Sequence, residues 1–245
     1  MRTASLRRWS SCDAENGRSS VFRITGQRFH HQNAAIPRPC GHDRATPPPG
    51  SQRVAANSSG ELVTSRLASD AGLNVETGGR YIALLELVGL VVWVRAWTPS
   101  LTSREKRHPK MVITDTGLAC GLLGRNAVGL GSPTSALTGP LLESFVTMEL
   151  VKQVAWSESQ PTIRHWRDRN GAEVDLIVED DDGSVAGIEI KGSSTVTASD
   201  VKRLRDLHDK LGDKFIAGLV LYLGDRIVPL GERLWALPVS VLWSD

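Results

Sequence analysis

Acidic and apolar residues alternate along two short segments in the second half of the chain. Residues 173–179 read Glu-Val-Asp-Leu-Ile-Val-Glu, and residues 185–191 read Val-Ala-Gly-Ile-Glu-Ile-Lys. A period of two puts successive side chains on opposite faces, as in a β-strand with one apolar and one polar face. The run between them, Asp180–Ser184, consists of turn-forming residues. The pattern therefore predicts two strands joined as an antiparallel hairpin.

The predicted pairing of these strands brings carboxylates together. A five-residue turn sets Glu179 opposite Val185, and counting inward sets Asp175 opposite Glu189. A slip by one residue would turn carboxylates towards the apolar side, so the parity of the pattern protects this register. Two facing carboxylates repel each other unless a cation lies between them, and Mg²⁺ and Mn²⁺ prefer oxygen ligands. We therefore expect Mg²⁺ or Mn²⁺ at Asp175 and Glu189.

Two further residues complete the candidate site. Lys191 follows Glu189 by two residues on the same face, where it can orient an attacking water or neutralise charge that grows on a phosphate. Upstream, Pro140 indicates the first turn of a helix in which Glu143 lies at the edge of the apolar stripe. A helix that packs on the sheet can therefore aim Glu143 inward. The candidate catalytic residues are Glu143, Asp175, Glu189 and Lys191, and the three carboxylates among them are the candidate metal ligands.

The order helix Glu, strand Asp, strand Glu-x-Lys resembles the PD-(D/E)xK nuclease superfamily. The version it resembles is the C-terminal domain, domain of unknown function family 4143, of a widespread family of prokaryotic AAA+ ATPases. The segments that carry the resemblance are Lys110–Ala119, Leu142–Val146, His165–Asp175, Ile188–Ser193, Leu237–Val239 and Leu242-Trp243. The resemblance implies an α/β fold over residues 108–245, a restriction-endonuclease-like mixed sheet flanked by helices. It also implies a metal held by Asp175 and Glu189 and a nuclease that acts on DNA.

The chain departs from that family in one respect. Full-length members resemble P-loop ATPases at their N-terminal end, but no Gly-Lys-Ser/Thr occurs in this sequence, and that motif forms the phosphate cradle of such ATPases. Two classes of function therefore stay open. One is a Mg²⁺-dependent endonuclease, which the intact Glu, Asp, Glu-x-Lys set favours. The other is a non-catalytic DNA- or protein-binding module of a truncated protein, which the missing ATPase favours; an ATPase or another protein partner would then act in trans.

Residues 56–107 predict a small winged-helix-like module. Leu62–Leu73 reads as a helix ended by a glycine, Asn74 can cap a second helix, and Val91–Trp97 reads as a strand. The pair Gly78-Gly79 lies in the second helix, where each glycine costs about 1 kcal/mol relative to alanine. A single arginine precedes the apolar part of that helix. We therefore expect this module to pack or to dock a partner rather than to read DNA bases.

Residues 1–55 have a different composition from the rest of the chain. They hold nine arginines, no lysine and three acidic residues, a charge of +6, while the remaining 190 residues carry a charge of −4. Leu6 is the only leucine before Leu62. Such a segment buries too little apolar surface to offset a chain entropy of about 1–2 kcal/mol per residue, which predicts disorder. The tail either holds nucleic acid through phosphate contacts or, as we prefer, comes from a truncated or shifted reading frame.

Cysteines and hydropathy indicate a cytoplasmic protein. The three cysteines Cys12, Cys40 and Cys120 are widely spaced and form no disulfide framework. Histidines near Cys40 lack the paired Cys-x-x-Cys spacing of a zinc site. The longest apolar run, Tyr81–Val94, is interrupted by Glu86 and is shorter than the roughly 20 residues that cross a bilayer. We therefore expect no membrane partner.

Overall fold

The structure is a computed structural model that describes residues 49–61, 63–98, 108–124, 137–168 and 171–243. Its helices are α1 (Pro49–Ala56), α2 (Thr64–Asp70), α3 (Val75–Leu87), α5 (Thr116–Leu122), α7 (Thr138–Trp156) and α8 (Ala198–Leu211), with the short 3-10 helices η2 (Gly212–Lys214) and η3 (Val239–Trp243). Its strands are β1 (Gly60–Glu61), β2 (Val91–Ala96), β3 (Lys110–Ile113), β4 (Thr162–Arg167), β5 (Glu173–Glu179), β6 (Val185–Lys191), β7 (Phe215–Tyr222), β8 (Val228–Gly231) and β9 (Leu234–Pro238).

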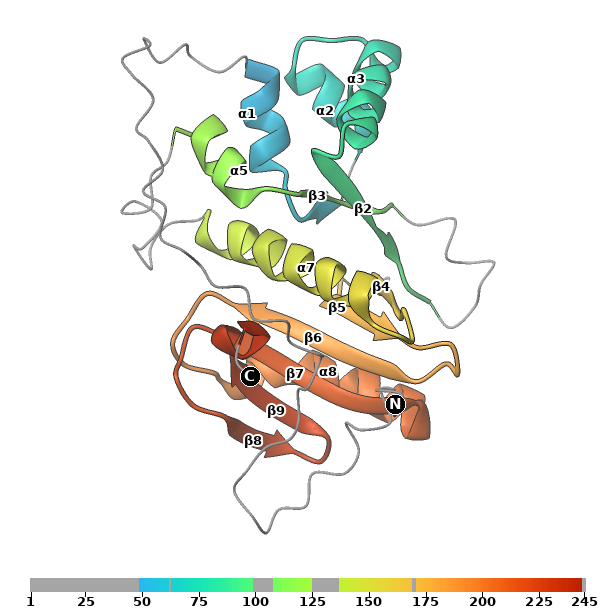
Figure 1. The fold of residues 1–245 in the computed structure, drawn as a ribbon, viewed down its shortest axis with the longest axis vertical. Helices are drawn as coiled ribbons and strands as arrows, with labels where there is room; N and C mark the ends of the chain where they lie inside the picture. The colour runs from blue at the N-terminus through green and yellow to red at the C-terminus, as the bar shows by residue number, and fades with distance from the viewer. Residues whose placement is uncertain (1–48, 62, 99–107, 125–136, 169–170, 244–245) are drawn as a thin grey trace.

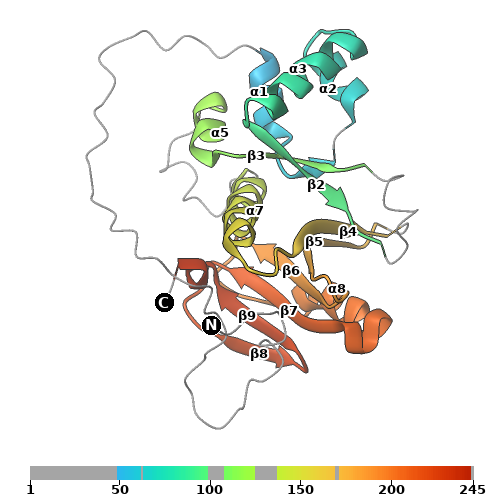
Figure 2. The same cartoon turned by 45° about the vertical axis from the view of Figure 1, so that its right-hand side comes forward.

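The described strands form one mixed sheet in the order β1-β3-β2-β4-β5-β6-β7-β9-β8. The pairs β2–β4, β6–β7 and β7–β9 are parallel, and the other neighbours are antiparallel. Helices α1, α2, α3 and α5 gather at one end of the molecule, and α7 lies between them and strands β7 to β9 (Figure 1 and Figure 2). The prediction of an α/β fold with a mixed sheet flanked by helices is confirmed. The restriction-endonuclease-like and winged-helix-like details stay predictions.

Helices α7 and α8 cover opposite faces of the central strands. Val146, Met148 and Leu150 of α7 pack with one set of strand side chains, whereas Leu204 and Leu207 of α8 pack with the other set. Strands β6 and β7 are buried on both faces, which explains why β7 reads as a continuous apolar run. The helix α8 connects the parallel strands β6 and β7, which forms a strand-helix-strand crossover.

Strand β5 does not keep a single apolar face. Leu176 and Val178 lie in the cluster beneath α7, whereas Val174 lies with Ile177 in the cluster beneath α8. The pairing of β5 with β4 shifts by one residue in this stretch, and such a β-bulge turns the strand over locally. The prediction that Val174, Leu176 and Val178 share one face is therefore wrong. The bulge redirects the side chains at the start of β5.

The register predicted for the β5–β6 hairpin is confirmed where the strands pair. Glu179 lies opposite Val185, and Leu176 lies opposite Ile188. The described pairing ends there. Just beyond it, the Asp175 side chain, rather than a main-chain carbonyl, accepts a hydrogen bond from the β6 backbone. The two strands therefore separate at the end where the candidate residues lie.

Side-chain caps begin three of the helices. Asn74 accepts a hydrogen bond from the backbone of α3, and Asp115 does the same for α5, as the sequence predicts. Helix α8 follows Thr197, which forms a reciprocal capping box with Asp200. Ser199, which by residue type could also cap this helix, lies inside its first turn instead.

Helix α3 turns only a narrow stripe towards the rest of the protein. Gly78 and Ile82 are buried, while the large apolar side chains of Tyr81 and Leu84 are exposed. A Cβ added at Gly78 would lie 2.6 Å from the Cβ of Ala68 in α2. The glycine therefore allows the two helices to approach closely, which gives it a packing role.

The segment for which composition predicts a disordered tail ends in a helix. Helix α1 begins at Pro49, and its residue Ala55 is buried in a hydrophobic cluster with Leu67, Met111 and Leu141. The last seven residues of the segment 1–55 are therefore structured, whereas residues 1–48 lie outside the described residues. Among the described helices, none has both the length and the hydropathy that a bilayer span requires.

Candidate functional site

A cavity of about 310 Å³ opens between the separated ends of β5 and β6 and the first turns of α8. Three of the four predicted site residues line it: Asp175, Glu189 and Lys191. The fourth, Glu143, is not among its lining residues. The remaining lining residues are Gly171, Glu173, Ser199, Asp200 and Arg203. The hairpin thus brings together the strand residues that the sequence predicts, and α8 supplies the opposite wall.

Glu189 is the buried carboxylate of this cavity, with 4% of the residue exposed. Its Oε2 accepts a 3.0 Å hydrogen bond from Nζ of Lys191, whereas its Oε1 is buried without a hydrogen-bond partner among the described residues. Burial and the nearby charge of Asp175 raise the pKa of Glu189 to about 8, against the opposing effect of Lys191. Lys191 therefore offsets only part of the cost of burying the negative charge of an ionised Glu189.

Asp175 lines the cavity and is hydrogen-bonded to the neighbouring strand β6. Its Oδ2 accepts a 2.8 Å hydrogen bond from the backbone N–H of Ile190. Burial raises the pKa of Asp175, although Lys110, the Ile190 N–H and Lys191 act in the other direction. The charge of Asp175 in turn raises the pKa of both Glu143 and Glu189. Asp175 is thus electrostatically linked to a carboxylate on each side of it.

Glu143 is held by a buried lysine. Nζ of Lys110 on β3 donates a 2.8 Å hydrogen bond to Oε1 of Glu143 on α7, and it also pairs with Oε1 of Glu173 at 2.5 Å. Only 4% of the Lys110 side chain is exposed. Burial by itself would lower the pKa of Lys110, but the charges of Glu143, Asp175 and Glu173 outweigh it and raise the pKa above its ordinary value. Lys110 is therefore a fixed internal cation beside the cavity.

The pKa values of the two carboxylates that share Lys110 move in opposite directions. Burial and the charge of Asp175 raise the pKa of Glu143 to about 7, although Lys110 opposes them. For Glu173, burial acts upwards, but Lys110 and Arg167 prevail and lower the pKa. Glu173 is consequently the carboxylate of this group that stays ionised most readily.

The sequence carries no signal for the role of Lys110. It begins an apolar strand, and 33 residues separate it from Glu143. A lysine at the end of a strand ordinarily extends into solvent. Only the packing of α7 against β3 and β5 places two carboxylates at its ammonium group.

Three buried hydroxyls fix the start of α7, where Glu143 lies. Oγ of Ser144 is 2.7 Å from Oγ of Ser58 and 2.9 Å from Oγ of Ser59. Ser58 Oγ also accepts a hydrogen bond from the backbone N–H of Ile113 on β3. The helix is thereby tied to the strand that carries Lys110, which defines the position of Glu143.

His165 faces the same acidic side, a point that the sequence leaves open. Its Nε2 lies 3.1 Å from the backbone oxygen of His108. Burial, assisted by the charge of Lys110, lowers the pKa of His165. The next residue, Trp166, points the other way, and Nζ of Lys210 lies 5.0 Å from its ring centroid.

Two family models match the chain. Residues 138–242 match the domain of unknown function DUF4143, and residues 52–128 match the domain of unknown function DUF8612. A DUF4143 domain is present. All four predicted site residues lie within it. Lys110, in contrast, lies in the region that matches DUF8612, so the Lys110–Glu143 ion pair joins the two matched regions.

Relatives of the chain have been found in mycobacteria. The uncharacterized protein Rv2008c of Mycobacterium tuberculosis and the uncharacterized protein Mb2031c of Mycobacterium bovis are each 31% identical to it over 177 residues. The matched region covers 72% of this chain and 38% of each relative, so the chain spans about two fifths of the length of these curated relatives. No solved structure matches the chain significantly.

The donor set of the DUF4143 domain fits a divalent cation in part. Asp175 and Glu189 are neighbouring buried carboxylates with raised pKa values, and one oxygen of Glu189 has no partner among the described residues. A bound cation relieves that situation, because it favours the ionised form of both groups. Glu143 fits less well, because its Oε1 already accepts from Lys110. Within the described residues, no group of three or more His, Cys, Asp or Glu side chains is arranged to hold a metal ion.

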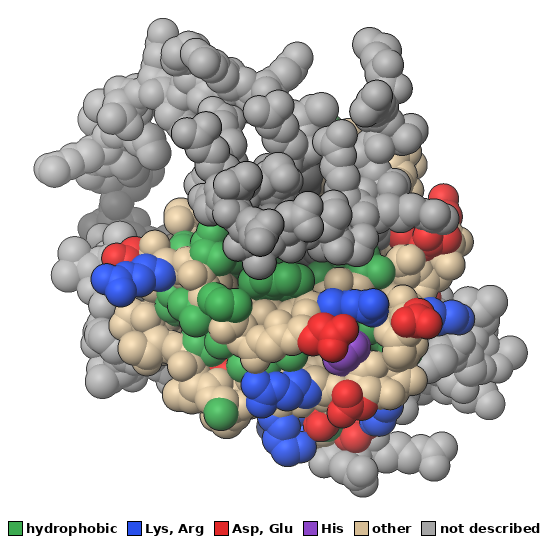
Figure 3. Space-filling model, turned by 90° about the horizontal axis from the view of Figure 1, so that it is seen from below, with side chains coloured by type: hydrophobic (Ala, Val, Ile, Leu, Met, Phe, Trp, Pro, Cys, Tyr) green, Lys and Arg blue, Asp and Glu red, His purple; other side chains and the backbone are tan. Residues whose placement is uncertain are grey.

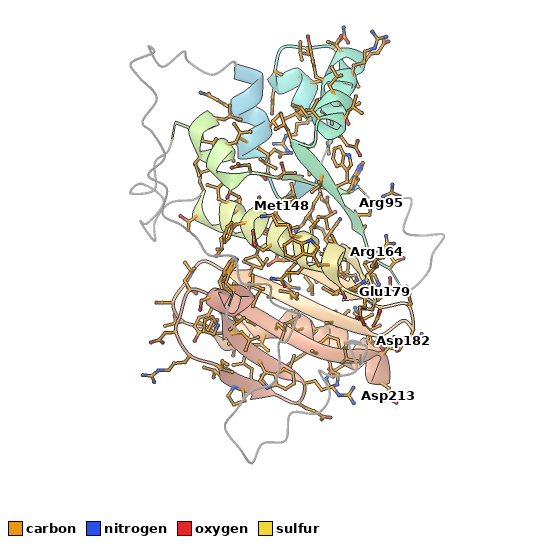
Figure 4. All side chains as sticks on the ribbon, in the orientation of Figure 1. Arg95, Met148, Arg164, Glu179, Asp182 and Asp213 are labelled. Atoms are coloured by element: carbon orange, nitrogen blue, oxygen red, sulfur yellow. The ribbon has the colours of Figure 1, made fainter. Side chains whose placement is uncertain are left out.

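Strand β5 of the DUF4143 domain has a glutamate at each end, and Glu179, at its C-terminal end, lies outside the cavity. Glu179 pairs with Arg164 of β4 at 3.8 Å (Figure 4). Glu179 is not a lining residue of the cavity. It therefore offers a matched acidic position on the same strand for control substitutions.

Proposed function

We propose that the DUF4143 domain is a divalent-metal-dependent nuclease-like domain that acts on the phosphodiester bonds of DNA. One observation carries the proposal: Asp175, Glu189 and Lys191 line a single cavity, in which a buried oxygen of Glu189 has no hydrogen-bond partner among the described residues. The order of these residues along the chain resembles that of PD-(D/E)xK nucleases, which supports the same conclusion.

Each residue has a distinct role in this proposal. Asp175 and Glu189 hold Mg²⁺ or Mn²⁺, which when bound supplies Lewis-acid polarisation of a phosphoryl oxygen and lowers the pKa of a coordinated water. Lys191, already directed at Glu189 by a hydrogen bond, stabilises negative charge on the attacking water or on the phosphate. Glu143 supports the site indirectly, because it holds Lys110 in place.

A non-catalytic binding module is the second candidate. It is favoured by the ion pairs of Lys110, which partly balance the charges of Glu143 and Glu173 without any metal. In that case the carboxylates serve the stability of the fold, and the chain binds DNA or a protein, such as an ATPase, in trans. The two candidates differ in whether the cavity residues affect cleavage.

A nicking assay tests the proposal. The full chain is incubated with supercoiled and with single-stranded DNA in the presence of Mg²⁺ or Mn²⁺, alongside Asp175→Ala, Lys191→Ala and the control Glu179→Gln. We expect each cavity substitution to lower cleavage by on the order of 10²-fold or more and the control to retain it. Cleavage that survives both cavity substitutions would come from a contaminant and would end the nuclease proposal.

Metal binding provides a second, independent measurement. Isothermal titration with Mn²⁺ is expected to give a binding signal for the wild-type chain that Asp175→Ala removes and Glu179→Gln retains. DNA binding without cleavage, together with no Mn²⁺ binding, would favour the non-catalytic module instead.

A further inference from the structure

The cavity of the DUF4143 domain is rich in carboxylates and poor in available cations. Its lining residues include four acidic side chains, Glu173, Asp175, Glu189 and Asp200, and two basic ones, Lys191 and Arg203. Lys191 is bound to Glu189. A phosphodiester that enters such a cavity meets repulsion, which a positive group on the cavity wall must offset.

Arg203 is the basic residue of this wall for which no partner is found among the described residues. Within the described part of the chain, the structure gives Arg203 no hydrogen bond and no ion pair, although it is only partly exposed. Asp200 lies one helical turn before it, but Oδ2 of Asp200 accepts from the backbone and side chain of Thr197 in the capping box. Asp200 is therefore held by Thr197, and it forms no ion pair with Arg203 among the described residues.

The other basic side chains of α8 have different environments. Lys202 is exposed and pairs with Asp206, and the Arg205 guanidinium donates to the backbone oxygen of Leu230. Neither residue lines the cavity. Basic and acidic side chains are also interspersed on the face shown in Figure 3, without a broad patch of one sign among the described side chains. On this face, attraction for a phosphate therefore depends on single, well-placed cations.

We propose that Arg203 binds a backbone phosphate of the DNA strand that enters the cavity, and so positions that strand at Asp175, Glu189 and Lys191. The proposal rests on the proposed function, since it names a substrate contact of the same site. A guanidinium group presents two parallel N–H donors that match two phosphate oxygens, which a lysine ammonium cannot do. The partnerless carboxylate oxygen of Glu189 in the same cavity is the second observation that points to a ligand here.

Binding is measured separately from cleavage. The full chain is titrated against a short, fluorescently labelled single-stranded DNA, with anisotropy read in EDTA and again in Ca²⁺. Arg203→Gln and Arg203→Lys are compared with Arg205→Gln, which removes a guanidinium from the same helix outside the cavity. We expect Arg203→Gln to weaken binding about tenfold and to reduce the salt dependence of log K by about 0.7, the value for one phosphate contact to a single strand. Arg203→Lys should keep the salt dependence and weaken binding less than Arg203→Gln does, because it loses only the paired donor geometry.

The outcomes separate this inference from the proposed function. DNA binding that depends on Arg203 but not on Arg205, in a chain that does not cleave, would uphold the phosphate contact and reject the nuclease. Cleavage that depends on Asp175 while Arg203→Gln binds DNA like the wild type would uphold the nuclease and overturn the contact. Equal losses in Arg203→Gln and Arg205→Gln, or no binding by the wild-type chain, would also overturn it.

Discussion

The backbone N–H of Ile190 donates a hydrogen bond of 2.8 Å to Oδ2 of Asp175. The bond links β6 to β5 just beyond their last described pair, Leu176 and Ile188. Asp175 is thus both a cavity carboxylate and the acceptor that closes the end of the hairpin. These two roles can be separated, because asparagine keeps an acceptor oxygen and removes the charge.

We predict different stabilities for Asp175→Ala and Asp175→Asn. Alanine leaves the Ile190 N–H without its acceptor, which should lower the free energy of unfolding by about 1–3 kcal/mol. Asparagine keeps the bond and removes the charge of a carboxyl group whose pKa is raised by burial. Because burial disfavours that charge, this variant should be at least as stable as the wild type at pH 8. Urea denaturation at that pH measures both. Equal destabilisation by the two substitutions would show that the hydrogen bond contributes nothing.

Removal of the buried lysine should strongly destabilise the protein. Lys110→Met leaves Glu143 and Glu173 as carboxylates without their cation, and breaking a buried ion pair costs about 3–5 kcal/mol. Adding Glu143→Gln to this variant should recover part of the loss, because one of the two charges disappears. Chemical denaturation of the single and double variants provides the test.

A second lysine of the same molecule serves as the matched control. Lys152 pairs with Glu149 on the exposed side of α7, with 51% of the lysine side chain accessible. Lys152→Met should change the free energy of unfolding by no more than about 0.5 kcal/mol, as expected of a surface pair. Similar losses at positions 110 and 152 would contradict the structural role assigned to the buried ion pair.

Stability should fall as the pH rises from about 6.5 to 8, above the range in which His165, whose pKa burial lowers, acts in the opposite direction. The folded-state pKa values of Glu143, about 7, and Glu189, about 8, lie above the ordinary value of 4.5. When the pKa of a carboxyl group is higher in the folded state, the folded state binds more protons than the unfolded state. The resulting stabilisation is complete below pH 4.5, and it is lost as the pH rises through the folded-state pKa values. We expect a loss of at least about 1 kcal/mol over this range, measured by urea denaturation at constant ionic strength.

Two variants and the addition of Mn²⁺ test whether the pH dependence of stability arises from the cavity carboxylates. Glu189→Gln should give a flatter profile than the wild type, while Glu179→Gln, outside the cavity, should leave the profile unchanged. If the cavity holds a divalent cation, Mn²⁺ should raise the melting temperature more at pH 8 than at pH 5, because it favours the ionised carboxylates. A wild-type profile that rises over the same range would contradict the assigned direction of the pKa shifts.

Adjacent glycines in α3 should respond to alanine with opposite signs. A Cβ at Gly78 would meet the Cβ of Ala68 at 2.6 Å, whereas the nearest contact at Gly79 is Thr64 Cγ2 at 3.9 Å. Gly79→Ala should therefore stabilise the protein by about 0.5–1 kcal/mol through helix propensity. Gly78→Ala should destabilise it by about 1–3 kcal/mol, because α2 and α3 must move apart. Thermal denaturation of both variants tests the pair, and stabilisation by both would refute the close packing of the helices.

The sequence alone predicted the features that depend on neighbouring residues. The alternation in 173–179 and 185–191 indicates two strands and their register, because parity decides which side chains reach the core. The caps at Asn74 and Asp115 follow from a polar side chain placed three residues before a free backbone N–H. Strand β7 follows from a short apolar run that only a sheet buried on both faces accommodates.

Only the tertiary structure decided which distant groups meet. The cation beside Glu143 of α7 is Lys110 of β3, and the cation on the opposite wall of the cavity is Arg203 of α8. The bulge in β5 depends on its pairing with β4, and the exposure of Tyr81 depends on how α3 meets α2. Electrostatic and packing energies depend on the distance between groups in space. That distance cannot be read from the number of residues that separate them along the chain. The elements were therefore predictable, whereas the charge balance of the candidate site was not.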